Sequence, residues 1–179
     1  MVRAFVALEL SQEIRDHLSI AQEIIRSCKA HLTFVDPKNI HITIKFLGEV
    51  EQEKLQKVID AVRSVTFPPF LIRAVNVTVN NPKRPNTIWC AIDDAGLGEH
   101  LFIRVEDALE SLGFEREIRR FTPHATIARV KSLDPSLFSA LNSLKGQSYG
   151  SCAINGIKLK KSTLLPQGPV YDDLLEVKW

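Results

Sequence analysis

The stretch Asn39-Ile40-His41-Ile42-Thr43-Ile44-Lys45-Phe46-Leu47-Gly48 alternates between apolar and polar side chains. A period of two is typical of a β-strand with one buried face, and the β-branched residues favour the same structure. This pattern puts four side chains on the core face, those of Ile40, Ile42, Ile44 and Phe46. The other face then carries an imidazole, which titrates near neutral pH, a short hydroxyl donor and an ammonium group, from His41, Thr43 and Lys45.

The same pattern returns at His124-Ala125-Thr126-Ile127, inside a second strand-like run from Phe121 to Val130. A single outward-facing histidine on a strand is more often an ordinary surface residue than a catalyst. Two copies of one short motif, both in predicted strands, indicate an internal repeat. The candidate catalytic residues are therefore His41, Thr43, His124 and Thr126.

Composition indicates one soluble globular domain. The chain has 179 residues, of which 45% are hydrophobic and 25% charged, and its net charge of +2 argues against a uniformly basic surface. Basic residues cluster around the second motif, namely Arg116, Arg119, Arg120, Arg129 and Lys131. Such a cluster can be a solvated face or an anion-binding site. Three scattered cysteines, no signal peptide and no membrane-length apolar run predict a cytoplasmic protein, with a monomer as the default.

Periodicity and capping signals predict the remaining elements. Further strands are expected over Val2–Leu10, Phe70–Val79, Thr87–Ile92, Ser151–Lys161 and Val170–Trp179. Helices are expected from Ser11 to about His31, and over Glu51–Val65, Leu97–Leu112 and Pro135–Leu144. Thr33–Asn39 and Leu165–Pro169 are expected to be loops.

The predicted order of elements is not the regular alternation of a doubly wound parallel sheet. It divides into two similar halves, Met1–Ile92 and the remainder, with the first strand of the second half weak or missing. Each half carries one motif. The sequence therefore predicts a single domain over residues 1–179, an α+β protein with a pseudo-twofold axis and the motif strands facing across a cleft.

The two motifs and their surroundings resemble the 2H phosphoesterase superfamily, and within it the RNA 2′,3′-cyclic phosphodiesterases, historically called 2′-5′ RNA ligases. The resemblance rests on Arg3–Ala7, His41–Gly48, Trp89, Pro123, Ala128-Arg129 and Leu165–Tyr171, besides the second motif itself. It covers essentially the whole chain in the same order. It implies a bilobal fold in which two antiparallel sheets line a central cleft and helices cover the outer faces.

Two histidines and two threonines suit the opening of a cyclic phosphate. The reaction needs a base to deprotonate water and an acid to protonate the departing ribose oxygen, and each contributes about 10²–10⁴-fold. Thr43 and Thr126 lie one pleat from each histidine and are placed to donate to the phosphoryl oxygens, although threonine is also an ordinary strand former. The scheme needs no metal or cofactor, and neither motif has a neighbouring carboxylate or cysteine to complete a zinc site.

The resemblance implies that His41 is the proton donor and His124 the proton acceptor that activates water, giving an RNA 2′-phosphate. The residues alone leave the two roles interchangeable, because the motifs are nearly identical. The reverse reaction is formally 2′-5′ ligation, which we expect to be secondary. The resemblance also makes Arg129 a substrate contact, yet simple alternation puts it on the face opposite His124 unless a bulge or the strand end re-aims it.

Three aromatic residues could stack a base, namely Phe5, Phe46 and Trp89. Phe46 shares its phase with the isoleucines and is predicted to lie in the core. The expected partner is RNA with a 2′,3′-cyclic phosphate or a 2′-5′ linkage, tRNA fragments included, and small cyclic nucleotides carry the same group. Two other classes stay open: a non-catalytic RNA-binding module, which would keep its affinity without the histidines, and a metal-dependent hydrolase, which a chelator would inactivate.

Overall fold

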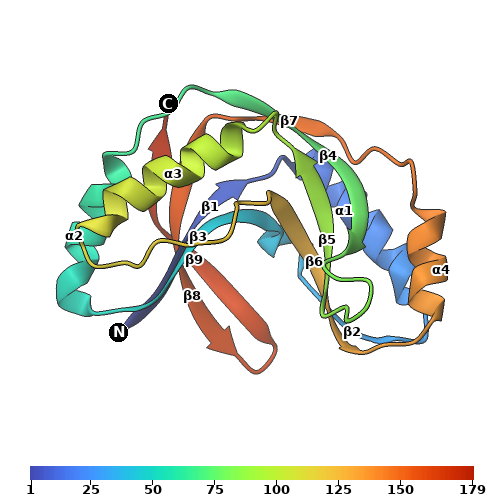
Figure 1. The fold of residues 1–179 in the computed structure, drawn as a ribbon. Helices are drawn as coiled ribbons and strands as arrows, with labels where there is room; N and C mark the ends of the chain where they lie inside the picture. The colour runs from blue at the N-terminus through green and yellow to red at the C-terminus, as the bar shows by residue number, and fades with distance from the viewer.

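The computed structural model describes residues 1–179 and shows an α+β protein built on one curved antiparallel sheet (Figure 1). The strands are β1 Val2–Glu9, β2 His31–Phe34, β3 His41–Val50, β4 Phe70–Val79, β5 Thr87–Asp93, β6 His124–Ser132, β7 Ser151–Ile154, β8 Gly156–Leu165 and β9 Gly168–Lys178. The helices are α1 Gln12–Arg26, α2 Gln52–Arg63, α3 Leu97–Glu110 and α4 Ser136–Ser143, with a 3₁₀ turn at Pro37–Asn39. The spatial order is β7-β4-β5-β6-β3-β1-β8-β9, and β2 pairs with β6.

The sheet has two halves, which we call lobes. The first lobe contains β3, β1, β8 and β9 and is covered by α2 and α3, whereas the second contains β6, β5, β4, β7 and β2 and is covered by α1 and α4 (Figure 1). They join where the two motif strands meet, through the single pair Ile42 and Ala125. The α+β bilobal fold is thus confirmed, with its two antiparallel halves hydrogen-bonded into one sheet.

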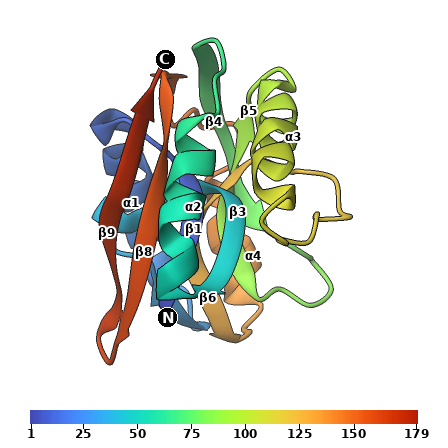
Figure 2. The same ribbon diagram turned by 90° about the vertical axis from the view of Figure 1, so that its left-hand side faces the viewer.

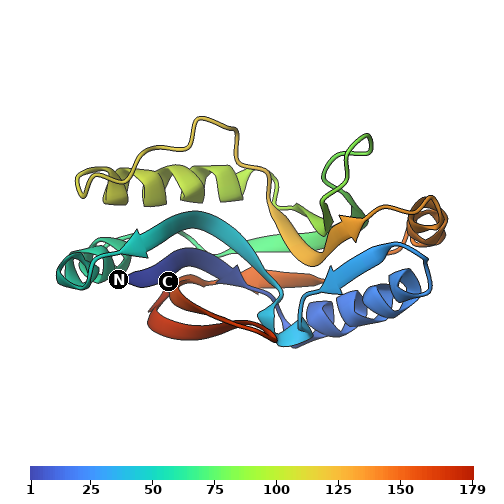
Figure 3. The same ribbon diagram turned by 90° about the horizontal axis from the view of Figure 1, so that it is seen from below.

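Each lobe mixes segments from both halves of the sequence. Helix α1 follows β1 in the chain but packs on β6, and α3 follows β5 but packs on β3. Seen from below, α3 and α1 lie towards opposite ends of the molecule, one on each lobe (Figure 3). The strand that seemed to be missing from the second half is β5, which lies beside β6 as β1 lies beside β3. A division of the sequence at Ile92 therefore does not separate the lobes.

Helix α1 begins where the capping signal predicted, because Ser11 Oγ accepts a hydrogen bond from the Ile14 N–H at 3.3 Å. It ends at Arg26, earlier than expected. After a turn at residues 27–30, His31–Phe34 form β2, where the sequence predicts the end of a helix and the start of a loop. Strand β2 is only four residues long, and its pairing with β6 is a contact between segments distant in sequence that local patterns do not reveal.

The C-terminal region also differs from the prediction, since Ser151–Lys161 is two strands. The chain leaves the second lobe after β7 and enters the first lobe at β8. Gly156 fits there because a Cβ at this position would lie 2.0 Å from the Val177 carbonyl oxygen. The expected loop 165–169 shrinks to a turn at Pro166 and Gln167, and the β8–β9 hairpin extends beyond the other strands (Figure 2).

One continuous cluster of 39 buried apolar residues runs through both lobes, so they share a core. It includes Ile14 and Leu18 of α1, Val58 of α2, and Leu101 and Leu109 of α3. These positions recur at helical spacing, which is why the helices could be predicted from sequence. No helix has both the length and the hydropathy that crossing a bilayer requires.

Candidate active site

Both motif strands contain a β-bulge at the same place. The pairing of β3 with β1 skips Ile44, and the pairing of β6 with β5 skips Ile127. Each is the fourth residue of its motif. A bulge adds one residue to a strand and so moves the following side chains to the other face. As a result, Phe46 and Arg129 return to the face that carries the histidines.

The bulge explains two wrong predictions in β3. Phe46 was expected in the core but is 69% exposed, with its ring centroid 6.0 Å from that of Phe5. Lys45 was expected on the polar face but is buried, and its ammonium lies 2.6 Å from Glu106 Oε1 on α3. Simple alternation placed Arg129 on the face opposite His124. The bulge at Ile127 brings Arg129 to the same face as His124, and its side chain is exposed.

The four motif side chains gather on one face where the lobes meet. Ile42 and Ala125, which pair across β3 and β6, are both buried. Neighbouring residues on a strand point the opposite way, so the other face carries His41, Thr43, His124 and Thr126. In the antiparallel register that this pair sets, each histidine lies across from the threonine of the other motif. The histidines are thus diagonal neighbours, and in a regular antiparallel pair such neighbours lie about 7–8 Å apart, with their Cβ atoms somewhat closer.

Each histidine ring is held by the carbonyl group two residues before it. His41 Nδ1 lies 2.6 Å from the Asn39 carbonyl oxygen, and His124 Nδ1 lies 2.7 Å from that of Thr122. A carbonyl only accepts, so Nδ1 carries the proton in both rings. Nε2 is then left for proton transfer in each ring, and in His41 it lies 3.0 Å from Thr43 Oγ1.

Aromatic rings pack against both imidazoles. The His41 ring stacks on Phe5 at 4.9 Å between centroids and meets the edge of Tyr171 at 5.4 Å. The Trp89 ring lies 4.2 Å from that of His124. Burial disfavours the charged form and lowers the pKa of both histidines.

The charges around the two histidines differ. Burial lowers the pKa of His41, whereas the hydrogen bond to Asn39 and the carboxylate of Glu9, its cross-strand neighbour, act to raise it. For His124, the hydrogen bond to the Thr122 carbonyl also acts to raise the pKa, whereas the charge of Arg129 lowers it further. The cations that oppose Glu9 are Lys160 and Arg15. Only His41 therefore has a carboxylate that favours its protonated form.

Cations from both lobes converge on Tyr171. Burial raises the pKa of its hydroxyl, and the charges of Arg129, Arg3 and Lys160 act in the opposite direction. Arg129 belongs to the second lobe, where its Nη1 donates to Thr87 Oγ1 at 3.0 Å. A site with several cations and two histidines favours a bound anion.

Comparison with known proteins identifies the family. A family model described as LigT like phosphoesterase matches residues 8–89 and 99–171. The chain belongs to this family.

Its relatives include two archaeal proteins named RNA 2′,3′-cyclic phosphodiesterase. The protein of Archaeoglobus fulgidus is 35% identical over 97% of this chain and 98% of its own length. That of Methanothermobacter thermautotrophicus is 33% identical over 97% of this chain and 96% of its own length.

Solved structures agree with this assignment. The protein TT0787 of Thermus thermophilus is 27% identical, with a TM-score of 0.82 over 98% of this chain and 97% of that one. E. coli LigT complexed with 3′-AMP is 20% identical, with a TM-score of 0.77 over 99% of this chain and 96% of that one, and at this identity it supports the fold alone. The fold is thus that of the 2H phosphoesterases.

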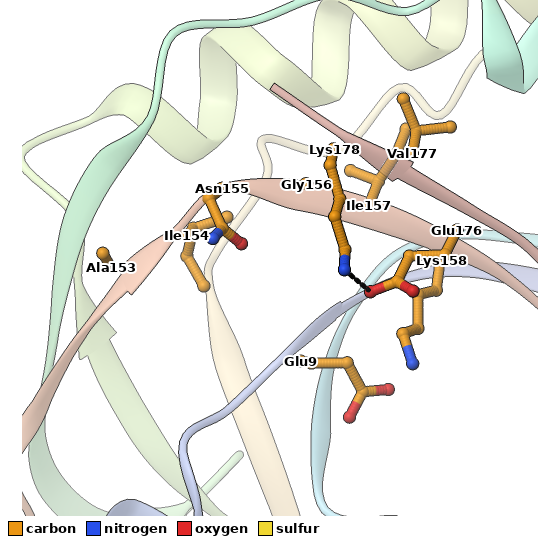
Figure 4. A pocket seen from close by; sticks show the side chains of 10 residues that line it. All are labelled: Glu9, Ala153, Ile154, Asn155, Gly156, Ile157, Lys158, Glu176, Val177 and Lys178. Carbon is orange, nitrogen blue, oxygen red and sulfur yellow. Dashed lines mark ion pairs between the residues drawn. The ribbon is translucent and has the colours of Figure 1, made fainter.

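A separate pocket in this LigT-like protein lies next to the first lobe's histidine, because Glu9, the cross-strand neighbour of His41, is one of its lining residues. Its lining residues are Glu9, Ala153, Ile154, Asn155, Gly156, Ile157, Lys158, Glu176, Val177 and Lys178. Figure 4 shows the ion pair between Lys178 and Glu176, 3.7 Å apart, near the carboxylate of Glu9. Its charges are balanced and it contains neither histidine, so we assign it no chemistry. No three His, Cys, Asp or Glu side chains in the protein are grouped to hold a metal ion.

Several residues of this LigT-like site have no role that the sequence predicts. Tyr171 was quoted in the resemblance, but nothing local showed that it would lie against His41. Glu9 and Thr87 reach the site through strand pairing with β3 and β6. Only Glu9 had a signal in the sequence, because it lies at the end of the first predicted strand. The strand that pairs with it, β3, could not be predicted from the sequence.

Proposed function

We propose that this chain is an RNA 2′,3′-cyclic phosphodiesterase that opens the cyclic phosphate to a 2′-phosphomonoester. The observation that carries the proposal is the diagonal pair of histidines, each with Nδ1 held by a carbonyl and Nε2 left for chemistry, on one face with converging cations. The names of the archaeal relatives support the same activity.

In the proposed mechanism His124 is the proton acceptor and His41 the proton donor. His124 Nε2 takes a proton from water, and the water oxygen forms a bond to phosphorus. The bond from phosphorus to the ribose 3′ oxygen breaks on the opposite side, and His41 gives its proton to that oxygen. The phosphate then remains on the 2′ oxygen.

The charges support this assignment of roles, which the sequence left open. The donor must be protonated before the reaction, and Glu9 favours the protonated form of His41. The acceptor must be neutral, and Arg129 favours the neutral form of His124. If an RNA 5′-hydroxyl took the place of water in the same steps, it would form the bond to phosphorus, the 3′ oxygen would leave, and a 2′-5′ linkage would result, which we propose as a secondary ligation.

Thr43, Thr126 and Arg129 are the proposed contacts to the phosphoryl oxygens. Thr43 Oγ1 is already within 3.0 Å of the catalytic nitrogen of His41, so a small rotation would let it donate to a bound phosphate instead. Fixed donors of this kind stabilise the added negative charge of the transition state. Phe46, exposed on the same face, is the proposed platform for the terminal base.

We propose that the reaction requires no metal or cofactor and that the protein acts as a cytoplasmic monomer of one domain. The substrates are RNA ends with a cyclic phosphate, and fragments of tRNA are a candidate source. The site chemistry also suits small cyclic nucleotides, which carry the same cyclic phosphate.

The test is hydrolysis of a short RNA that ends in a 2′,3′-cyclic phosphate, with excess EDTA, by the wild type, His41→Ala and His124→Ala. We expect turnover in EDTA, a 2′-phosphate product, and loss of about 10²–10⁴-fold in either variant. Undiminished activity in both variants would refute the mechanism. Binding of RNA without turnover would favour an RNA-binding module, and inhibition by EDTA would favour a metal-dependent hydrolase.

A further inference from the structure

The loop between β4 and β5, residues 80–86, carries basic side chains that no acidic group neutralises. Lys83 and Arg84 are both exposed, and neither has a carboxylate within 4.0 Å. The same is true of Arg129 and Lys131 on the neighbouring strand β6. Four cations therefore lie on adjacent segments of the second lobe without local partners, and free cations of this kind attract an extended polyanion.

Side chains within the loop hold it in a defined shape. Asn81 Oδ1 accepts the backbone N–H of Lys83 at 2.9 Å, and Asn80 Oδ1 accepts that of Asn86 at 3.1 Å. The loop is also tied to β6, because the Val130 N–H donates to the Asn86 carbonyl oxygen at 3.0 Å. The basic residues thus start from a preorganised backbone, which reduces the entropy lost on binding.

A buried hydroxyl links the loop to Arg129. Thr87 is 6% exposed, and its Oγ1 accepts a hydrogen bond from Arg129 Nη1 and donates one to Asn86 Oδ1, both at 3.0 Å. The loop and the proposed phosphate contact therefore belong to one hydrogen-bonded unit. That unit begins at the histidine face and continues away from it along β5 and β6.

The loop lies too far from the histidines to touch a single nucleotide. On β5, Ala91 pairs with His124, and Thr87, where the loop ends, lies four strand positions further along. At about 3.3 Å per residue the loop therefore begins roughly 13 Å from the position opposite His124. A cyclic mononucleotide bound at the histidines would leave Lys83 and Arg84 free, whereas a strand would bring further phosphates to them.

We propose that the β4–β5 loop, together with Lys131, binds the phosphates of the RNA strand that leads into the cyclic end, beyond the reacting phosphate that Arg129 contacts. The inference rests on the proposed function and adds a substrate class to it: oligonucleotides are preferred over cyclic mononucleotides. The contacts are to the backbone, so the preference depends on length and salt rather than on base sequence.

The experiment compares kcat/KM for cytidine 2′,3′-cyclic phosphate with that for an eight-nucleotide RNA ending in a 2′,3′-cyclic phosphate. We expect the wild type to prefer the oligonucleotide. The variant K83S/R84S should raise KM for the oligonucleotide by about 2- to 30-fold, as for the loss of two exposed ion pairs. It should leave KM for the mononucleotide unchanged. For the oligonucleotide, it should reduce the steepness of the plot of log affinity against log salt concentration by roughly 1.4.

The matched control is K57S/K145S, which removes the same charge from exposed cations on α2 and beyond α4 that also lack acidic partners. It should behave as the wild type. A wild type without length preference, or a K83S/R84S variant that weakens both substrates equally, would overturn the proposal. If the wild type hydrolyses neither substrate, the proposed function fails, but the role of the loop can still be tested by equilibrium binding. The ligand is the eight-nucleotide RNA with a 2′-phosphate end. Equal affinity of K83S/R84S and K57S/K145S for this RNA would overturn the loop assignment.

Discussion

Phe46 and Arg129 occupy equivalent positions in the two lobes. Each is the fifth residue after its motif histidine, and each reaches the histidine face because the pairing skips the isoleucine of its motif. One lobe thus presents an exposed aromatic ring and the other a guanidinium group. A nearly symmetric set of histidines and threonines is therefore flanked by groups of different chemistry, which is what an asymmetric substrate with a base and a phosphate requires.

Arg129→Ala should lower kcat/KM for a cyclic-phosphate RNA by about 10- to 150-fold, as for loss of charge-assisted hydrogen bonds worth about 1.5–3 kcal/mol. Thr87→Val removes the hydroxyl that orients the guanidinium and keeps the charge, so it should have a smaller effect in the same direction. Steady-state kinetics measure both. Full activity in Arg129→Ala would exclude it as a substrate contact.

Phe46→Ala should raise KM without loss of stability, because its side chain is 69% exposed. Base–aromatic stacking is worth about 1–3 kcal/mol, so the expected increase in KM is about 5- to 150-fold. Phe46→Trp should retain binding. The control is Ile20→Ala, which removes an exposed apolar side chain on α1, away from β3. An unchanged KM in Phe46→Ala would argue against stacking at this position.

Glu9→Gln should move the descending limb of the pH profile of kcat/KM to lower pH. Glu9 raises the pKa of His41, so its removal lowers that pKa, and the proton donor is then lost at a lower pH. The ascending limb, which depends on the acceptor His124, should stay in place. Glu23→Gln, an exposed carboxylate on α1, serves as the control. A shift of the ascending limb alone would reverse the assigned roles.

The buried pair of Lys45 and Glu106 should make single substitutions costly. Lys45→Met or Glu106→Leu leaves one charge buried without its partner, which typically destabilises a fold by about 3–5 kcal/mol. The double variant should recover most of that loss, since two apolar side chains can replace a buried ion pair. Urea unfolding measures all three variants. Additive losses in the double variant would contradict this account.

The sequence alone was enough to predict the motif residues, the two strands that carry them, and the other strands and helices to within a few residues, apart from β2 and the division of β7 from β8. These features depend on local periodicity, on Ser11 as a cap and on chemistry carried by short motifs. The catalytic roles of His41 and His124 remain predictions, but their placement together on one face followed from the repeat and the expected symmetry.

Only the tertiary structure decided which residues surround those histidines. The bulges at Ile44 and Ile127 arise from how each motif strand pairs with its neighbour, and they reversed the expected positions of Lys45 and Phe46 and brought Arg129 to the histidine face. Alternation is a property of neighbouring residues, whereas a bulge, a cross-strand neighbour such as Glu9 and the mixing of segments between lobes depend on contacts between residues far apart in the chain. Those contacts are chosen by the packing of the whole core, which no local pattern encodes.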